Sequence, residues 1–567
     1  MTDPSAPRTG PSTPRTDHHA GHDRALPEAH VRIDTRRPLG TVSDDIYGHF
    51  LESAFFGNIT GGVFDEGSEL SLDGPGHLDG MRSDVLDLVK ELRPGAIRWP
   101  GGNFTSAYHW EDGIGPRDQR PARRELAWGE IETNRYGTDE FLAWCEAVGA
   151  DAYLAHSARD IDEAVRWVDY TNGAGETTMA RARRANGRED PWRVRYWGVG
   201  NEVYGPWQMG HRSAERYAED AAEHARFMRA VDPGIELVGV GIPWDQERWT
   251  TPLLAKAGRF LDHLSLHHYG ASNHLITGDD YDDVVAQSLF FEREISRYSQ
   301  LITDLSARLG LDRVPQLVID EWNMRHLEPA SWPEPRAGAD GGIAERDTPA
   351  VEGLPQHTRV SRYSPRTLGD AVFSAGVFQA IHRSVGDASA VTMANPVNLL
   401  NANGIVVARP EGAFGSTLYH VWHLYRHHTG RTVLPVTVDG PARSTNVRLG
   451  DSRDPEGNQP TAPMTVPYLD VVATRADDGS IRLAVVNRHR SQSIRLRPVL
   501  DDSADATPTR ARIRSLGGDV TDLNASNSLS APATVAVRDL GDVAADGGAW
   551  VLPPHSVSVL ILAGAGT

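Results

Sequence analysis

The sequence contains a single cysteine, Cys145, in 567 residues. An intramolecular disulfide is therefore excluded, which is typical of proteins from reducing compartments. Cys145 lies in an apolar helical stretch, and we interpret it as a buried structural thiol. No apolar run approaches the ~18 residues that span a bilayer, so no membrane segment is expected. Residues 1–30 are rich in Pro, Thr, Ser, Asp and His and lack the apolar segment of a signal peptide. We therefore expect a disordered leader and a cytoplasmic protein.

Basic residues are also fewer than acidic ones. Lys and Arg number 57 against 77 Asp and Glu, and the formal net charge is −20. An acidic surface repels phosphate backbones, so nucleic acid is not an expected partner. Hydrophobic residues make up 39% of the chain, with 14 Trp, 15 Tyr and 13 Phe, which is enough for a large core and excludes global disorder. The length predicts more than one domain.

Residues 43–430 show a regular alternation of short apolar runs and amphipathic helical stretches. One helical stretch carries Val85, Leu86, Val89 and Leu92 on one face, and another opens with Ser213, a suitable capping residue. The expected strands lie near Ile46–Gly48, Ala96–Trp99, Ala152–Ala155, Val194–Gly198, Ile235–Val240, His263–His267, Gln316–Asp320 and Ala390–Met393. Eight strands separated by helices predict a parallel (β/α)8 barrel, or TIM barrel.

The sequence changes character within and after this region. Residues 333–366 are dense in Pro, Gly, Asp and Arg, and we expect a long surface loop between strands seven and eight. In residues 431–567, strand-like runs alternate with turn clusters, which predicts an antiparallel, jelly-roll-like β-sandwich. Residues 31–42 begin with a strand-like run, Val31–Thr35, that we expect to join this sandwich.

Two glutamates follow predicted barrel strands. Glu202 comes after strand four in Gly200-Asn-Glu-Val-Tyr, and Glu321 comes after strand seven in Ile319-Asp-Glu-Trp-Asn. Barrel active sites lie at the C-terminal ends of the strands, so these carboxylates can face each other across the mouth. A single Glu is more often an exposed loop residue. A pair ~5 Å apart, however, suits a retaining glycosidase, in which one carboxylate attacks the sugar and the other protonates the leaving oxygen.

Six motifs, in order and spacing, resemble glycoside hydrolase family 51. They are Tyr47–Glu52 (YGHFLE), Arg98–Phe104 (RWPGGNF), His109–Pro116 (HWEDGIGP), Gly200–Gly210 (GNEVYGPWQMG), Ser265–Tyr269 (SLHHY) and Asp320–Asn323 (DEWN). The resemblance runs from about Arg32 to the C-terminus. It implies a barrel with a C-terminal β-sandwich, and an α-L-arabinofuranosidase that needs no cofactor and acts on arabinose-containing oligosaccharides. It also implies a homo-oligomer, commonly a hexamer.

The resemblance also implies a role for each matching residue. Glu202 resembles the general acid/base and Glu321 the nucleophile, and an ionised Glu321 is expected to raise the pKa of Glu202 and keep it protonated. Arg98 is expected to keep Glu321 ionised, and Tyr269 to orient it by a hydrogen bond. Asn201 resembles the residue that binds the sugar 2-hydroxyl. The remaining expected site residues are Glu52 and Asn103 for other hydroxyls, His267, and Trp110 as an aromatic wall, for which ordinary core packing stays an alternative.

At two places the chain departs from the family pattern. Asn401 stands where the family usually has a Gln that helps to bind the sugar, and it is one methylene shorter. It either reaches the sugar through water or belongs to a remodelled subsite. The segment Ser53–Thr60 is also unusual, and we expect it over the sugar pocket. These departures keep open a galactofuranosidic, D-arabinofuranosidic or xylosidic substrate.

Two further classes of protein stay open. A non-catalytic sugar-binding barrel would need the aromatic and amide contacts, but not both carboxylates. A metal-dependent hydrolase is suggested by His263, His267 and His268. On a strand, however, His268 points away from the other two, and no carboxylate lies at ligand spacing. We therefore predict a retaining, exo-acting α-L-arabinofuranosidase with neither metal nor cofactor.

Overall fold

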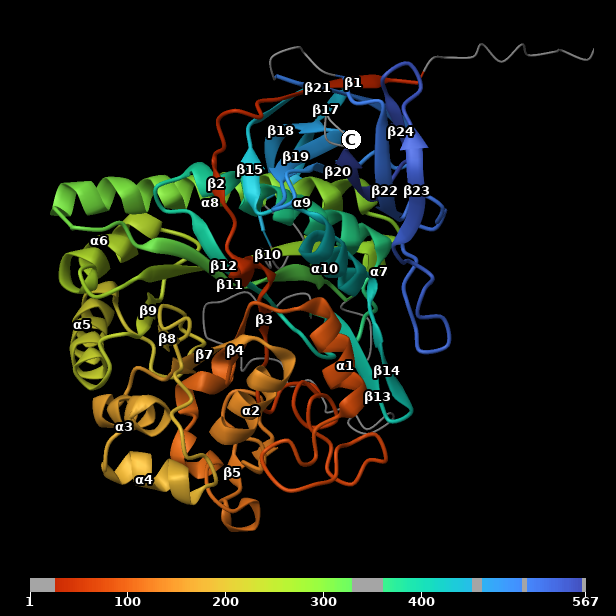
Figure 1. Ribbon diagram of the computed structural model, residues 1–567. Helices are drawn as coiled ribbons and strands as arrows, with labels where there is room; N and C mark the ends of the chain where they lie inside the picture. The colour runs from red at the N-terminus through yellow and green to blue at the C-terminus, as the bar shows by residue number, and fades with distance from the viewer. Residues whose placement is uncertain (1–25, 329–359, 451–460, 502–506, 563–567) are drawn as a thin grey trace, which may run out of the picture.

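The computed structural model describes residues 26–328, 360–450, 461–501 and 507–562. Within these ranges an eight-stranded parallel sheet has the order β12-β11-β10-β9-β8-β7-β4-β3 (Figure 1). Its strands are β3 (His49–Phe50), β4 (Ala96–Trp99), β7 (Asp151–His156), β8 (Tyr196–Val199), β9 (Glu236–Gly239), β10 (His263–Ser272), β11 (Gln316–His326) and β12 (Val391–Pro396). The edge strands meet where the side chain of Asn395 donates to the carbonyl of His49 at 2.8 Å. The sheet is thus a nearly closed barrel, which confirms the predicted fold class.

Helices connect the strands and cover the barrel. In chain order they are α1 (Ser83–Leu92), α2 (Thr138–Val148), α3 (Ile161–Asn172), α4 (Thr178–Ala185), α5 (Ala214–Val231), α6 (Gln246–Ala257), α7 (His274–Thr277), α8 (Tyr281–Leu309), α9 (Leu368–Arg383) and α10 (Thr417–His428). The predicted apolar face of α1 is buried. Ser213 caps α5, because its hydroxyl accepts from the backbone N–H of Arg216 at 3.3 Å. Cys145 is buried in α2, as predicted.

The prediction of a first strand at Ile46–Gly48 is wrong. A 3-10 helix occupies Asp44–Tyr47, and β3 begins at His49. The hydroxyl of Ser43 accepts from the backbone N–H of Asp45, which begins this turn locally. The turn-forming tendency of the Ser-Asp-Asp sequence therefore outweighs the strand tendency of the apolar residues that follow it.

Strands β10 and β11 extend well beyond their predicted ends, to Ser272 and His326. Their pairing shifts register between Ser265 and His267, and the pairing of β11 with β12 shifts between Ile319 and Trp322. A bulge re-aims the side chains that follow it. After the shift, His267 of β10 pairs with Glu321 of β11, so two predicted site residues become neighbours on adjacent strands.

The C-terminal part of the chain forms antiparallel sheets that pack against the barrel. One sheet has the order β2-β15-β19-β20-β25-β22-β23 and a second has the order β16-β1-β21-β24. Their strands are β1 (Glu28–Ile33), β2 (Gly40–Thr41), β15 (Thr432–Leu434), β16 (Val436–Asp439), β19 (Leu469–Arg475), β20 (Ile481–Asn487), β21 (Ile494–Leu500), β22 (Arg510–Leu516), β23 (Arg538–Ala544), β24 (Trp550–Leu552) and β25 (Ser556–Leu562). Strand β1 pairs antiparallel with β16 and parallel with β21.

Hairpins β5–β6 (Arg123–Arg124, Ile131–Glu132), β13–β14 (Val406–Arg409, Gly412–Gly415) and β17–β18 (Ala442–Arg448, Thr461–Pro467) complete the described strands. Figure 1 shows the blue sandwich strands over α9 and α10. At this junction the buried carboxylate of Asp470 binds Arg383 at 2.8 Å and Arg488 at 2.6 Å. Although burial raises the pKa of Asp470, the two guanidinium groups hold it well below its usual range. The ion pairs fix the sandwich on the barrel.

Two predicted segments fall largely outside the described residues. Of the predicted leader, residues 1–25 lie outside, and β1 begins at Glu28 rather than at Val31. Of the predicted loop at 333–366, residues 333–359 lie outside, and its described end is tied to the barrel by a bridge from Val360 to Leu327. Among the described residues, no helix combines the length and apolarity needed to span a bilayer.

Candidate active site

Glu202 lies in the tight turn that follows β8, with a left-handed backbone φ of 43°. Gly200, at φ 96°, opens this turn in a conformation that favours glycine. The carboxylate accepts hydrogen bonds from the Tyr204 hydroxyl at 3.2 Å and from the Trp207 indole at 3.0 Å. Its side chain keeps 15% of its surface exposed. The turn thus presents a held but accessible carboxylate at the barrel mouth.

Glu321 is more deeply buried, in the middle of β11. Nη1 of Arg98, on β4, donates to its Oε1 at 2.9 Å, and the hydroxyl of Tyr269 donates to its Oε2 at 2.8 Å. Both contacts are those that the family resemblance implies. Arg98 itself is 1% exposed and is also held by Asp320, whose Oδ2 lies 3.6 Å from its Nε. Donors from β4 and β10 thus fix the position of the Glu321 carboxylate.

His267 lies between the two glutamates. Its Nδ1 is 2.9 Å from Oε1 of Glu202 and 3.5 Å from Oε2 of Glu321, and its Nε2 is 3.2 Å from Oδ1 of Asp320. One oxygen of each glutamate and a ring nitrogen of His267 all lie within 4.8 Å of one another. The two carboxylates therefore have the short separation that the sequence analysis specified for a retaining pair.

The protonation of this set differs from the prediction. Burial lowers the pKa of His267, but the carboxylates of Glu321 and Asp320 raise it to about 10. Burial raises the pKa of Glu202, but the hydrogen bond from His267 lowers it to about 2. The expected rise in the pKa of Glu202 is therefore wrong for the free site. The contact with the His267 imidazolium outweighs the effect of burial on the Glu202 carboxylate, so the proton resides on His267.

Two of the predicted sugar-binding side chains, Asn201 and Glu52, lie beside Arg98 and Glu321. Asn201 is buried, its Oδ1 accepts from Nη2 of Arg98 at 2.5 Å, and its Nδ2 has no partner among the described residues. Oε1 of Glu52 accepts from the backbone N–H of Phe104 at 3.0 Å. Burial raises the pKa of Glu52 to about 8. A Cβ at Gly102 would lie 3.1 Å from Oε1 of Glu321 and 3.6 Å from Oε1 of Glu52. Asn103 follows Gly102 in the chain, and within the described part of the chain no hydrogen bond places its side chain among these groups. These groups offer amide donors and a carboxyl to a polyhydroxylated ring.

The structure does not place Trp110 in the wall of this pocket. The indole is 1% exposed, stacks on Trp167 with ring centres 5.7 Å apart, and donates to the carbonyl of Glu163 at 3.0 Å. Core packing, the alternative for Trp110, is what the structure shows. The aromatic residue that does reach the pocket is Trp128, which sequence reasoning missed. Its Nε1 donates to Oε1 of Glu52 at 3.0 Å, and its ring packs edge-on against Phe55 at 4.7 Å.

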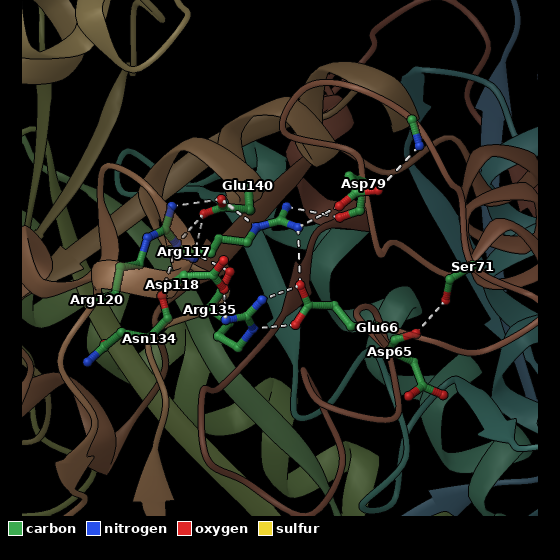
Figure 2. Close-up of polar contacts among 12 residues, drawn as sticks. Asp65, Glu66, Ser71, Asp79, Arg117, Asp118, Arg120, Asn134, Arg135 and Glu140 are labelled. Atoms are coloured by element: carbon green, nitrogen blue, oxygen red, sulfur yellow. Dashed lines mark hydrogen bonds and ion pairs between the residues drawn. The ribbon is translucent and has the colours of Figure 1, made fainter.

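Trp128 is carried by the excursion between β4 and α2, and an arginine network holds that excursion in place. Figure 2 shows Arg117 and Arg120 directed at Glu140, the third residue of α2, whose side chain is 1% exposed. Arg120 also donates to the carbonyls of Gly115 at 2.8 Å and Asn134 at 2.9 Å. Arg120 therefore joins both arms of the excursion to the barrel helix that follows it.

Asn401 does not point a free amide at the sugar. Its Nδ2 donates to the carbonyl of Gly57 at 2.7 Å, and its Oδ1 accepts from the backbone N–H of Ala408 at 2.9 Å. Asn58 adds a parallel tie, donating to the carbonyl of Leu400 at 2.8 Å. The remodelled-subsite alternative fits these contacts, because Asn401 holds the Ser53–Thr60 segment in place instead of binding a hydroxyl directly.

The histidine cluster that suggested a metal is dispersed. His263 pairs with Glu236 at 2.8 Å, and the ring of His268 packs edge-on against Phe291 with centres 4.6 Å apart. Glu202, His267 and Glu321 are instead a group whose atoms are spaced closely enough to hold an ion. The carboxylate oxygens of Glu202 and Glu321 already contact His267, Tyr269 and Arg98, so we interpret the group as an acid–base set.

Comparison with known proteins agrees with this geometry. Residues 88–286 match the family model of an alpha-L-arabinofuranosidase 1 domain, and residues 320–556 match that of an alpha-L-arabinofuranosidase C-terminal domain. The chain is 34% identical to alpha-L-arabinofuranosidase C of Emericella nidulans over 484 residues, which cover 82% of this chain and 86% of the relative. It belongs to glycoside hydrolase family 51. Another relative, the exo-alpha-(1→6)-L-arabinofuranosidase of Bifidobacterium longum, is 31% identical over 83% of this chain and 85% of its own length.

Solved structures of family 51 enzymes share the whole architecture. The arabinose complex of the Thermotoga maritima alpha-L-arabinofuranosidase superposes with a TM-score of 0.77 at 31% identity, covering 94% of this chain and 99% of its own. The family 51 enzyme of Thermotoga petrophila gives a TM-score of 0.78 at 30% identity, covering 94% and 100%. The family barrel and sandwich are therefore both present in this chain.

Proposed function

We propose that this family 51 member is an exo-acting, retaining α-L-arabinofuranosidase that releases terminal L-arabinofuranose from arabino-oligosaccharides by double displacement. The observation that carries the proposal is the pair formed by Glu202 and Glu321, with oxygens within 4.8 Å of one another at the barrel mouth. That separation leaves no room for a water between sugar and carboxylate, as an inverting enzyme requires, and suits direct attack.

In the first step, an oxygen of Glu321 attacks the anomeric carbon as the glycosidic C–O bond breaks. The leaving oxygen takes a proton from Glu202. Since that proton resides on His267 in the free site, it passes along the 2.9 Å contact to Glu202 as the charge of Glu321 is consumed. Asn201, with its unpartnered Nδ2, donates to a ring hydroxyl as positive charge develops on the sugar.

In the second step, Glu202 accepts a proton from water while the water oxygen attacks the anomeric carbon. The bond to Glu321 breaks, and its electron pair returns to the carboxylate. Two inversions leave the configuration of the arabinose unchanged. Arg98 and Tyr269 donate to Glu321 at 2.9 Å and 2.8 Å, so both stabilise the carboxylate as it leaves.

Exo action is supported by the apolar side chains that pack beside Glu52. Phe55, Phe56 and Ala402 form a buried apolar cluster, and Trp128 packs on it. Trp128 contacts both this cluster and Glu52, so we infer that a sugar ring bound at Glu52 has little space for a further sugar on that side.

The test is turnover of para-nitrophenyl α-L-arabinofuranoside, followed by proton NMR to identify the anomer first released. The proposal predicts turnover with α-arabinofuranose appearing first. Initial β-arabinofuranose contradicts double displacement. If only the galactofuranoside, D-arabinofuranoside or xyloside is hydrolysed, the remodelled Asn401 subsite selects another sugar. Sugar binding without turnover points to a non-catalytic barrel, and loss of turnover in chelator points to a metal-dependent hydrolase.

Cytoplasmic location and homo-oligomeric assembly stay predictions. Cell fractionation tests the first, and light scattering of the purified protein tests the second against a monomer mass of 62.0 kDa.

A further inference from the structure

An exposed tryptophan stands beside the acid/base. Trp244 lies in the loop between β9 and α6, on the face of the barrel where the strands end, and 49% of its surface is exposed. We propose that Trp244 is the platform on which the pyranose ring of the leaving group stacks. This inference rests on the proposed function and extends it to the subsite beyond the scissile bond, and to oligosaccharides that carry the arabinofuranose on a pyranose ring.

Two aromatic residues connect Trp244 to Glu202. Its ring packs edge-on against Tyr204 with centres 5.2 Å apart and lies tilted to Trp207 at 6.0 Å. Tyr204 and Trp207 are the two side chains that donate to the Glu202 carboxylate from the same turn. The three rings thus form one aromatic surface that begins at the acid/base and ends in solvent at Trp244.

The leaving group has to lie on this side of the site. In the proposed complex the furanose lies against Glu52 and Asn201, next to the buried Glu321. Glu202 protonates the glycosidic oxygen, and its side chain keeps 15% of its surface exposed against 8% for Glu321. The chain of the substrate therefore leaves the pocket past Glu202, over Tyr204 and Trp207 and towards Trp244.

The chemistry of the loop fits an uncharged sugar ring. A pyranose offers one face of C–H bonds that packs on an indole, and hydroxyls at its edge that need polar partners. Asp245 follows Trp244 directly and pairs at 3.7 Å with Arg248 in the first turn of α6; their side chains are 57% and 82% exposed. Apolar surface with carboxylate and guanidinium groups at its rim is what a pyranose requires.

The experiment compares two substrates that share the furanose and differ in the leaving group. One is methyl α-L-arabinofuranoside, which releases methanol and has no ring to stack. The other is a xylo-oligosaccharide that carries one α-L-arabinofuranosyl side residue. We expect Trp244→Ala to lower kcat/KM for the oligosaccharide about tenfold and to leave the methyl glycoside within roughly twofold of wild type. Trp244→Phe should keep most of the activity on the oligosaccharide.

The matched control is Phe227→Ala on α5, where the removed ring is 48% exposed and belongs to no part of the site. Phe227→Ala should leave kcat/KM unchanged for both substrates. An equal loss on both substrates in Trp244→Ala would mean that Trp244 only supports Glu202, and no loss on either would remove its role altogether. A lower particle mass by light scattering would show that a second copy covers the ring. Each of these outcomes overturns the proposal, while wild-type protein that hydrolyses neither substrate contradicts the proposed function itself.

Discussion

Nδ1 of His267 lies 2.9 Å from Oε1 of Glu202, and this contact holds the proton of the free site on the imidazole. The pair shares one proton that is lost only near pH 10, the pKa to which the surrounding carboxylates raise His267. In the proposed mechanism, proton donation to the leaving group therefore depends on His267, which contacts Glu202 and not the glycosidic oxygen.

The first prediction is that His267→Asn moves the alkaline limb of kcat/KM to lower pH. In this variant the proton must reside on Glu202 alone, whose carboxyl loses it at lower pH than the imidazolium does. The measurement is the pH profile of kcat/KM on an arabinofuranoside with a poor leaving group, which depends on acid catalysis. An unchanged alkaline limb with a uniformly lower rate would instead make His267 only a packing residue.

The second prediction concerns Arg98, which donates to Glu321 at 2.9 Å and to Asn201 at 2.5 Å. Arg98→Lys keeps the charge but cannot serve both acceptors in one plane. We expect kcat to fall by about a hundredfold or more, because both the nucleophile and Asn201 lose their orientation. Arg98→Met should also lower stability by about 3–5 kcal/mol, since it leaves buried carboxylates unpaired. Steady-state kinetics and urea unfolding measure the two effects; Arg98→Lys with wild-type kcat would contradict the assignment.

The third prediction is that Glu52→Gln stabilises the protein more at pH 8 than at pH 4.5. The unfolded chain releases the Glu52 proton near its ordinary pKa of 4.5, whereas burial raises the folded value to about 8. Between these values the folded state binds more protons, so its stability falls as pH rises, by up to about 1.4 kcal/mol per pH unit. Gln keeps the hydrogen bonds from Phe104 and Trp128 and removes this loss.

Thermal unfolding of wild type and Glu52→Gln at pH 8 and at pH 4.5 measures this difference in stability. Glu411→Gln, at an exposed position, is the control. Equal shifts in Tm at both pH values would show that Glu52 does not carry the raised pKa.

The fourth prediction concerns the arginine network in Figure 2. Arg120→Met removes donors to Glu140, Gly115 and Asn134, and its side chain is 3% exposed. We expect a loss of about 3–5 kcal/mol and a higher KM, because the excursion that places Trp128 on Glu52 loosens. The control is Arg135→Met, whose half-exposed pairs with Glu66 and Asp118 should contribute about 1 kcal/mol at most. A higher KM in the control alone would contradict this role of Arg120.

The sequence predicted the barrel and the proximity of Glu202 and Glu321 because both follow from general rules. Alternating strands and helices specify the barrel, and barrel strands deliver their last residues to one face, so Glu202 and Glu321 had to meet. The sequence could not predict which tryptophan of the excursion after β4 contacts Glu52, because that depends on the path of the loop. Trp110 and Trp128 lie in the same excursion after β4, and nothing in their spacing tells which one turns back to Glu52.

Local backbone geometry explains the other two differences between prediction and structure, which concern Asn401 and Glu202. Asn401 is the first of consecutive left-handed residues, at φ 45°, and this turn directs its amide at Gly57 and Ala408. The state of Glu202 depends on an imidazole that a β-bulge places between two acids. Neither a turn of this kind nor a bulge is visible in residue types alone.

The most direct test of the catalytic pair is azide rescue of Glu321→Ala and Glu202→Ala on para-nitrophenyl α-L-arabinofuranoside. The account predicts that azide restores turnover in Glu321→Ala with the inverted β-arabinofuranosyl azide as product. In Glu202→Ala, azide should intercept the glycosyl-enzyme and give the retained α-azide. The opposite pairing of products would exchange the two roles, and failure of azide to restore turnover in Glu321→Ala, with both variants folded, would contradict Glu321 as the nucleophile.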